Sequence, residues 1–262
     1  MTEILFPALA VGAIALVLGG LLAFASIVFK VETDEREEQI GEILPGANCG
    51  GCGYAGCSAF AKAIVTEGAD ITRCNLMTDE KLAQICDIMG VSAGKKVKVV
   101  ATVRCKGTCG VAKDKFEYYG APDCITAAQL GGGAKACDYG CLGLGTCVEK
   151  CAFGAISIED GIAVVDKSKC VGCGACARVC PKGVIAMIDA KISAVVKCNS
   201  SEKGAVVRNL CDAGCIGCKI CEKKCEYDAI HVEDNLARVD SSKCSACGEC
   251  VNACPKKIIE IM

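Results

Sequence analysis

The sequence repeats itself with a period of 74 residues, and the repeat is dense in cysteine. Residues 147–170 (CVEKCAFGAISIEDGIAVVDKSKC) align without gaps with residues 221–244 (CEKKCEYDAIHVEDNLARVDSSKC). Each copy then runs into four cysteines and a proline, CVGCGACARVCP at 170–181 and CSACGECVNACP at 244–255. A fixed internal period indicates that one small supersecondary unit is present twice. The repeat therefore predicts two tandem modules.

The repeat extends upstream of these runs, with one exception. Cysteines correspond as follows: Cys124, Cys137, Cys141 and Cys147 in the first copy, and Cys198, Cys211, Cys215 and Cys221 in the second. Cys218 has no cysteine counterpart, because Leu144 occupies that position in the first copy. The opening motif of the first copy therefore lacks its middle cysteine.

Between its two cysteine runs, each copy alternates apolar and polar residues around a turn signal. The signal is Asp160-Gly161 in the first copy and Asp234-Asn235 in the second. Such alternation predicts a β-hairpin. A short helical turn is expected after each cysteine run, ahead of residues 183–185 and 257–259. The copies thus predict an α+β fold made of two tandem ferredoxin-like (βαββαβ-type) dicluster modules.

The spacing C-x2-C-x2-C-x3-C-P is that of bacterial ferredoxins, which bind [4Fe-4S] clusters. Three thiolates of such a run hold one cluster, while the fourth reaches across to the second cluster of the pair. In the second copy this rule predicts two ligand sets: Cys215, Cys218, Cys221 and Cys254, and Cys225, Cys244, Cys247 and Cys250. In the first copy it predicts Cys151, Cys170, Cys173 and Cys176, and also Cys137, Cys141, Cys147 and Cys180. Cys137 enters the last set because Leu144 cannot be a ligand.

Two other uses of these cysteines fit less well. Structural zinc sites use two separated cysteine pairs for each tetrahedral ion, whereas each run here holds four cysteines and ends in Cys-Pro. Disulfides do not explain the spacing of the runs. They also conflict with the reducing compartment that dense C-x2-C motifs indicate.

A different cysteine motif precedes the repeats, NCGGCGYAGCSAFAKAI at 48–64. Its glycines let main-chain amides approach the cysteine sulfurs, which stabilises the negative charge of a cluster. Apolar residues with helical spacing follow the last cysteine of the motif. We predict a further four-iron site here, formed by Cys49, Cys52, Cys57 and Cys74.

Six of the 26 cysteines remain outside these five sets. Cys86 lies in the amphipathic segment TDEKLAQICDIMG and is expected to be a buried free thiol. Three others are candidates for a sixth [4Fe-4S] site, with Cys198 or Cys211 as the fourth ligand: Cys105, Cys109 and Cys124. The sequence leaves both the existence of this site and its fourth ligand open.

The N-terminal segment differs from the rest because residues 4–29 include no charged side chain. A helix of that length would span about 39 Å, enough to cross a bilayer. A cleaved signal peptide is the alternative, but the segment lacks a basic n-region and its apolar run is long. Lys30 favours a cytoplasmic C-terminal side. We therefore predict a single-pass anchor in the cell membrane, with the iron–sulfur domains on the cytoplasmic side.

These features divide the chain into six predicted segments. They are a transmembrane anchor (1–30), an acidic linker (31–45), a small N-terminal 4Fe-4S domain (46–93), a middle segment with extra cysteines (94–134) and two ferredoxin-like dicluster domains (135–192 and 193–262). The linker is rich in glutamate and free of cysteine. We expect it to let the domains swing between partners.

The sequence offers no motif for substrate chemistry. It has no G-x-G-x-x-G fingerprint and no P-loop, so flavin and nicotinamide are expected on other subunits. The single histidine, His231, falls in a predicted hairpin. A formal net charge of −2 without a long basic run argues against a nucleic-acid partner. The chain is therefore predicted to conduct electrons, with no catalytic residue of its own.

The order of these motifs resembles that of the B subunits of the Rnf complex, the membrane-bound ferredoxin:NAD oxidoreductase. The resemblance covers essentially the whole chain and rests on LPGANCGGCGYAGC at 44–57, RCKGTCGVAKDKFEYYGAPDC at 104–124, KACDYGCLGLGTC at 135–147 and GCIGCKICEKKC at 214–225. Ala152 and Glu226 replace the proline expected after the opening runs, which affects a turn and no ligand. A similar glycine-cysteine motif occurs in corrinoid iron–sulfur proteins of carbon monoxide metabolism. A component of such a system is therefore the alternative.

The resemblance implies an electron-relay subunit of an ion-translocating oxidoreductase. Reduced ferredoxin would deliver electrons to this chain, which would pass them to membrane-embedded and NAD- or flavin-bearing subunits while the complex exports Na⁺ or H⁺. Five lysines flank the distal clusters and are candidates for a ferredoxin-docking face: Lys219, Lys223, Lys224, Lys256 and Lys257.

Overall fold

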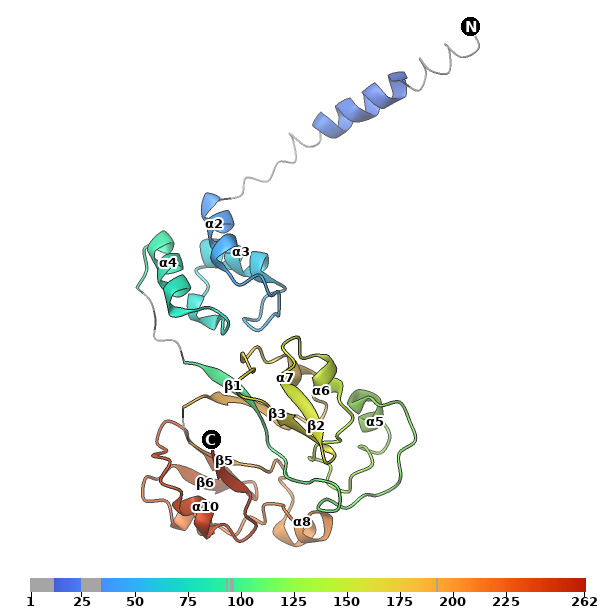
Figure 1. The fold of residues 1–262 in the computed structure, drawn as a ribbon, viewed down its shortest axis with the longest axis vertical. Coiled ribbons are helices and arrows are strands. Elements are labelled where there is room, and N and C mark those ends of the chain that lie inside the picture. The colour runs from blue at the N-terminus through green and yellow to red at the C-terminus, as the bar shows by residue number, and fades with distance from the viewer. Residues whose placement is uncertain (1–11, 25–33, 93, 95–96, 192) are drawn as a thin grey trace.

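The computed structural model describes residues 12–24, 34–92, 94, 97–191 and 193–262 (Figure 1). Residues 12–24 are helical. The two ends of the predicted anchor, residues 1–11 and 25–30, lie outside the described residues. Within the described part of the chain, no helix has the length and hydropathy needed to span a membrane.

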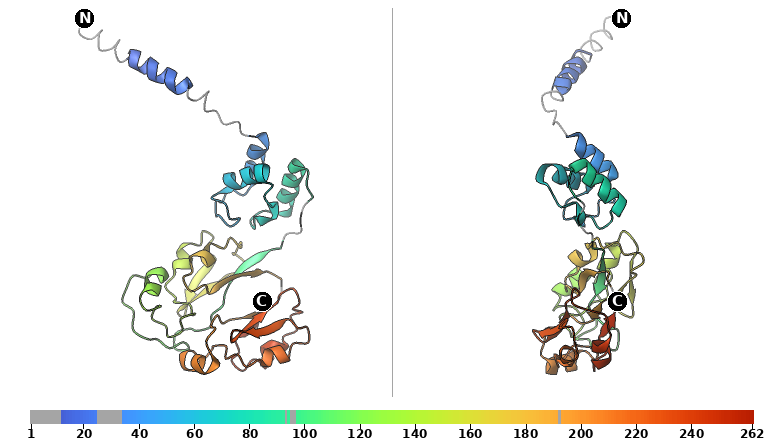
Figure 2. Two further views of the ribbon diagram at one scale, coloured as in Figure 1. Left: turned by 180° about the vertical axis from the view of Figure 1, so that it is seen from behind. Right: turned by 90° about the vertical axis from the view of Figure 1, so that its left-hand side faces the viewer.

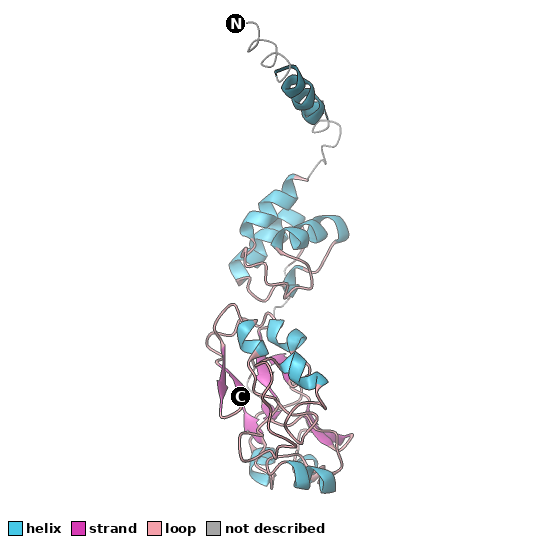
Figure 3. Cartoon of the chain, turned by 90° about the vertical axis from the view of Figure 1, so that its right-hand side faces the viewer, coloured by secondary structure: helices cyan, strands magenta, loops and turns pink. Residues whose placement is uncertain are grey.

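A small helical domain follows, with a core of its own. It contains α2 (Glu35–Ile43), α3 (Cys57–Glu67), the 3₁₀ helix η1 (Ile71–Arg73) and α4 (Asp79–Met89). The helices α3 and α4 both end at a glycine in the left-handed conformation, Gly68 (φ 65°) and Gly90 (φ 66°), where a residue with a side chain would be strained. Phe60, Ile64 and Ile85 are fully buried between these helices. Figure 3 shows this domain as helices and loops, while the strands lie in the rest of the chain.

Residues 34–45 do not form the flexible linker that the sequence predicts over residues 31–45. Residues 34–45 are described, and α2 occupies most of them, beginning at the N-cap Asp34, whose side chain accepts a hydrogen bond from the amide of Arg36. Ile40 is 0% exposed and Leu44 is 4% exposed, both in the core of the helical domain. Glu35, Glu38 and Glu42 are exposed on the side of α2 opposite this core, and the high charge of the segment obscured this pattern in the sequence.

The first module begins in what the sequence suggests is a separate middle segment. Its elements are β1 (Val99–Val103), α5 (Cys124–Gln129), α6 (Thr146–Glu149), β2 (Ile156–Glu159), β3 (Ile162–Val165), α7 (Ala175–Val179) and β4 (Ile185–Asp189). β1 pairs antiparallel with β4, from Val99 opposite Asp189 to Val103 opposite Ile185. The expected boundary at residue 134 therefore separates two strands of one sheet.

The second module repeats this order of elements. They are β5 (Ala194–Val196), α8 (Gly204–Leu210), α9 (Ile220–Lys223), β6 (Ile230–Glu233), β7 (Leu236–Val239), α10 (Glu249–Ala253) and β8 (Ile259–Ile261). β5 pairs antiparallel with β8, as β1 does with β4. Both predicted hairpins are confirmed, and their turn residues have positive φ, 46° and 74° at Asp160 and Gly161, 49° and 63° at Asp234 and Asn235. The predicted mixture of helices and short strands is confirmed.

The two modules differ in length at one place. The amide of Ala101 donates to the Cys170 sulfur at 3.4 Å, and the amide of Ala194 donates to the Cys244 sulfur at the same distance. These amides are 93 residues apart, whereas the two cysteines are 74 apart, so the first module holds 19 additional residues between its first strand and its hairpin. Figure 2 shows the extra chain as a long loop carrying α5 on the outside of the first module.

Candidate iron–sulfur sites

The four cysteines predicted for the N-terminal site line one cavity of the helical domain. They are Cys49, Cys52, Cys57 and Cys74. Cys57 is the first residue of α3, and its amide donates to Oδ1 of Asn48 at 2.8 Å. Gly50 and Gly53 have positive φ (66° and 92°), which lets the loop turn around the cavity. The structure therefore brings together the four cysteines that the sequence predicts for this site.

The N-terminal site lies directly against the first module. Cys173 lines the same cavity. Asn75 Nδ2 donates to the Gly172 carbonyl at 2.7 Å, and the Arg178 guanidinium donates to the carbonyls of Cys173 (3.2 Å) and Cys49 (3.3 Å). A Cβ at Gly51 would lie 2.9 Å from the Cys173 carbonyl oxygen, so only glycine lets the two loops approach this closely.

In the first module, the predicted set of Cys151, Cys170, Cys173 and Cys176 is brought together. Burial, followed by the nearby sulfurs of Cys170, Cys173 and Cys151, raises the pKa of the Cys176 thiol to about 11. The amide of Ala155 donates to the Cys151 sulfur at 3.3 Å, and Cys170 accepts from β1. Amide donors of this kind stabilise a negatively charged sulfur.

The second site of the first module differs from the expectation. Burial, followed by the sulfurs of Cys141, Cys124 and Cys180, raises the pKa of the Cys147 thiol to about 12. Cys124 thus occupies the place that the sequence assigned to Cys137. The additional 19 residues of this module include α5, which begins at Cys124 and returns the chain to α6.

Hydrogen bonds fix Cys124 at this position. Its amide donates to Oγ1 of Thr146 at 2.7 Å, and that hydroxyl donates to Oδ1 of Asp123 at 2.8 Å. Asp123 is also the N-cap of α5, where it accepts from the amide of Thr126. These bonds hold the pKa of the Asp123 carboxyl at about 2, led by the amide of Thr126 and the hydroxyl of Thr146. No sequence signal indicated that α5 would close on this site, because Cys124 is remote from the opening motif.

Both sets predicted for the second module are brought together. Cys215, Cys218, Cys221 and Cys254 line one cavity, and Cys225, Cys244, Cys247 and Cys250 line another. Burial is the largest cause that raises the pKa of the Cys221 thiol, to about 11, and of the Cys250 thiol. The amide of Ala229 donates to the Cys225 sulfur at 3.4 Å, as Ala155 does to Cys151 in the first module.

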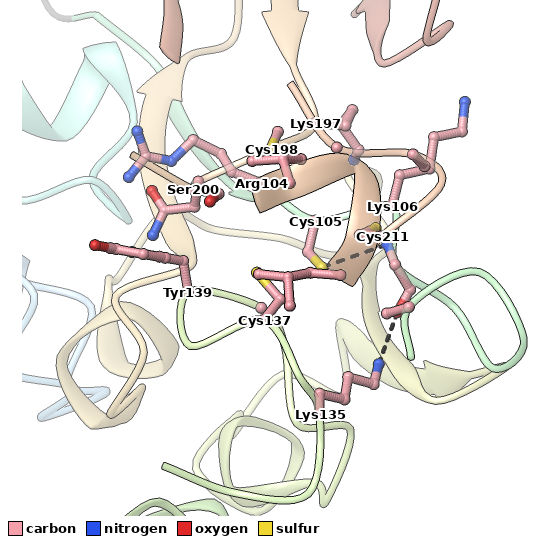
Figure 4. Close-up of a pocket in the computed structure, with 18 residues that line it drawn as sticks. Arg104, Cys105, Lys106, Lys135, Cys137, Tyr139, Lys197, Cys198, Ser200 and Cys211 are labelled. Atoms are coloured by element: carbon pink, nitrogen blue, oxygen red, sulfur yellow. Dashed lines mark hydrogen bonds between the residues drawn. The ribbon is translucent and has the colours of Figure 1, made fainter. Parts of the chain in front are cut away.

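A further group of four cysteines lies between the two modules (Figure 4), and we call it the middle site. It consists of Cys105, Cys137, Cys198 and Cys211, which line one cavity. Two come from each module in equivalent places, because Cys105 follows β1 as Cys198 follows β5, and Cys137 corresponds to Cys211 in the repeat. A sequence signal existed, since ATVRC at 101–105 matches AVVKC at 194–198 with an offset of 93.

The middle site adjoins one site of each module through a main-chain hydrogen bond. The amide of Cys141 donates to the Cys105 sulfur at 3.4 Å, and the amide of Cys215 donates to the Cys198 sulfur at 3.3 Å. Cys141 belongs to the Cys124 site and Cys215 to its counterpart in the second module. The two halves of the chain are therefore linked through the middle site.

Several cations line the middle site, as Figure 4 shows. Burial lowers the pKa of Arg104 and of Lys197. Lys135 is 7% exposed, and its ammonium donates to the carbonyls of Gly107 (2.7 Å) and Gly161 (2.8 Å). Among the described residues, Nε of Arg104 is buried without a hydrogen-bond acceptor. Positive charge thus gathers around four buried or half-buried thiols.

Two cysteines lie outside these six groups. Cys86 is 5% exposed in the core of the helical domain, as expected for a buried thiol, and burial raises its pKa. Cys109 is exposed, and its amide donates to the carbonyl of Asp160 at 2.9 Å. The sequence grouped Cys109 with Cys105, but Cys109 is absent from the lining of the middle site as the described residues define it.

The chemistry of the six groups fits iron–sulfur clusters. Each offers four thiols around a cavity or a buried centre, and in four of the groups main-chain amides from neighbouring strands and loops donate to cysteine sulfurs. In the described part of the chain, no group of three or more His, Cys, Asp or Glu side chains is arranged to hold a metal ion. A cubane binds each thiolate through a different iron, so its four sulfurs stand farther apart than the ligands of one tetrahedral ion.

Comparison with known families agrees with these groups. The family model described as "Putative Fe-S cluster" matches residues 44–75, a "4Fe-4S binding domain" matches 163–186, and a "4Fe-4S dicluster domain" matches 214–258. The presence of iron–sulfur domains is thereby established for both the helical domain and the repeats.

Full-length relatives are also known. The chain is 44% identical to the B subunit of the ion-translocating oxidoreductase complex of Methanosarcina acetivorans, with 100% of both chains covered. It is 45% identical to the B subunit of the Na⁺-translocating ferredoxin:NAD⁺ oxidoreductase complex of Acetobacterium woodii, over 99% of this chain and 78% of that one. It is 42% identical to the proton-translocating counterpart of Clostridium ljungdahlii, over 94% of this chain and 88% of that one. The resemblance found in the motifs is confirmed, and the chain belongs to the family of B subunits of ion-translocating oxidoreductase complexes.

Proposed function

We propose that this chain is the iron–sulfur electron-transfer subunit of an ion-translocating ferredoxin:NAD⁺ oxidoreductase complex. The observation that carries the proposal is the presence of six four-cysteine groups, of which the N-terminal group meets the first module at Cys173 and the middle site adjoins one group of each module. When bound, [4Fe-4S] clusters supply one-electron oxidation and reduction. The chain itself supplies thiolate ligands, amide donors to the sulfurs and the apolar surroundings that exclude water.

We assign 24 of the 26 cysteines as ligands. The six sets are Cys49, Cys52, Cys57 and Cys74; Cys151, Cys170, Cys173 and Cys176; Cys124, Cys141, Cys147 and Cys180; Cys105, Cys137, Cys198 and Cys211; Cys215, Cys218, Cys221 and Cys254; and Cys225, Cys244, Cys247 and Cys250. The N-terminal site contacts the first module, because Cys173 lines its cavity. The middle site contacts both modules, because the amides of Cys141 and Cys215 donate to the sulfurs of Cys105 and Cys198. We accordingly divide the described chain into the helical domain (34–92), the first module (97–191) and the second module (193–262).

Iron and sulfide content tests the number of sites. Six sites of four irons predict about 24 iron and 24 sulfide per chain, whereas five predict about 20. The measurement uses the full chain, purified or reconstituted without oxygen. A content of about 20 would contradict the middle site.

Paired substitutions test the ligand sets. With Cys137 and Cys198 in one set, Cys137→Ser combined with Cys198→Ser removes one cluster, about four irons. If Cys137 instead belonged with Cys147, the same pair would remove two clusters. The matched control is Cys137→Ser with Cys147→Ser, for which the two assignments predict the reverse result.

The partners follow from the family and the anchor segment. We propose that reduced ferredoxin is the electron donor, that the acceptors are the other subunits, and that residues 1–30 attach the chain to the cell membrane with its clusters on the cytoplasmic side. Deletion of residues 1–33 is expected to move the chain from the membrane fraction to the soluble fraction. Anaerobic stopped-flow mixing with reduced ferredoxin should bleach the cluster absorbance of the full chain, and absence of this reaction would refute the donor assignment.

A further inference from the structure

More positively charged side chains line the middle site than line the cavity of the N-terminal site or either cavity of the second module. Its lining holds four cations (Arg104, Lys106, Lys135 and Lys197), and no Asp or Glu occurs among the described residues that line it. No charged side chain of the described chain lines the N-terminal cavity. The two cavities of the second module are lined by Lys219 and Lys256 in one case and by Glu249 in the other.

Lys135 is the most unusual of these cations. Its side chain is buried, and both of its hydrogen-bond acceptors are neutral carbonyl oxygens. No carboxylate in the described part of the chain forms an ion pair with it. A buried charge without a counter-charge is costly. A thiolate-bound cluster is an anion, and its presence at this site would supply the missing counter-charge.

The acidic groups near the site do not cancel this charge. Glu260 accepts from Lys106 at 2.8 Å, but both side chains are about two-fifths exposed. Asp138 and Asp212 follow Cys137 and Cys211 in the chain, and neither is buried. Solvent screens exposed charges far more than buried ones. The unscreened charge that remains is positive.

We propose that Lys135, together with Lys197 and Arg104, gives the middle site the highest reduction potential in the chain. The proposal depends on the proposed function, because it requires a cluster at this site. Reduction adds one electron, taken from the reductant, and changes no bond. Since the reduced cluster is the more negative state, buried cations stabilise it more than they stabilise the oxidised state. The site between the two modules would therefore be reduced first.

An EPR-monitored redox titration of the full, cluster-loaded chain tests this. The signal of the middle site is identified as the one absent in Cys198→Ala. We expect this signal to have the highest midpoint in the unsubstituted chain. Lys135→Met should lower the equilibrium constant for reduction of the middle site at least tenfold, which lowers its midpoint potential by about 59 mV for a one-electron couple. Lys135→Arg should keep the original midpoint, and Lys203→Met, at a lysine outside the cavity lining, should change nothing.

A midpoint of the middle-site signal below that of another cluster in the unsubstituted chain would overturn the proposal, and so would either of two results with the variants. One is an unchanged midpoint in Lys135→Met with full iron content, and the other is an equal shift in Lys135→Met and Lys135→Arg, which would indicate a packing effect. If Lys135→Met fails to load clusters, Lys197→Met provides the same comparison. An iron content of about 20 in the unsubstituted chain would instead refute the proposed ligand sets, so the two failures are distinguishable.

Discussion

The contact between the helical domain and the first module can be tested at a single glycine. A methyl group at Gly51 would lie 2.9 Å from the carbonyl oxygen of Cys173 and 3.0 Å from its Cα. Gly51 does not have positive φ, so alanine there causes no backbone strain. The neighbouring atoms are main-chain atoms and cannot rotate away. Gly51→Ala must therefore push the two loops apart.

The expected cost of this overpacking is about 1–3 kcal/mol. Because the clash exists only when the domains are in contact, the cost shifts the equilibrium between closed and open contact by roughly 5- to 150-fold. Arg178→Ala should act in the same direction, since it removes hydrogen bonds to the carbonyls of Cys49 and Cys173. The consequence for function is weaker coupling between the N-terminal site and the first module.

Hydrogen–deuterium exchange of the full, cluster-loaded chain measures this opening. Peptides covering 48–57 and 170–178 should exchange faster in Gly51→Ala, with iron content unchanged. Gly41→Ala is the matched control, because it lies inside α2 and a Cβ there meets no atom within 4 Å. Exchange in Gly51→Ala equal to that of the unsubstituted chain, or an equal change in Gly41→Ala, would refute the close contact.

Three further predictions address other parts of the chain. Ile40→Ala should destabilise the helical domain by about 2–5 kcal/mol in chemical unfolding, because Ile40 is 0% exposed, whereas Glu38→Ala on the exposed face should have little effect. Asp123→Asn should make about four irons per chain, the content of one cluster, leave faster in the presence of a chelator, because it weakens the hydrogen bonds that hold Cys124. Unchanged kinetics of iron loss would show that these hydrogen bonds do not hold Cys124. Lys223→Glu with Lys224→Glu, at two exposed positions of the proposed docking face, should slow reduction by ferredoxin most at low salt, and a rate independent of these charges would exclude them from the docking face.

Local features of the modules followed from the sequence. The hairpin turns at 160–161 and 234–235 require residues that tolerate positive φ, and Asp, Asn and Gly are such residues. The helical domain was recognised from its cysteine motif. Its first helix was not, because the glutamates of α2 obscured the single buried stripe that contains Ile40.

The cysteine groups divide in the same way into those that the sequence predicts and those that it does not. Where the cysteines of a set lie in the two runs of one repeat, as in the second module, their spacing identifies the set. Cys124 and Cys137 could not be assigned by spacing, because both precede the opening motif and either could replace the position occupied by Leu144. The choice depends on where the chain between β1 and α6 returns to the module.

The sequence by itself determined the kind of chemistry, the duplication of the module and the cysteine groups whose members are close along the chain. The tertiary structure decided the rest. Strands β1 and β5 bring Cys105 and Cys198 to the junction between the modules, and the 19 additional residues of the first module carry Cys124 to α6 while leaving Cys137 at the junction. The physical reason is that a cysteine's residue type and spacing report only local geometry, whereas the meeting of distant cysteines is set by strand pairing and by the path of the loop between them.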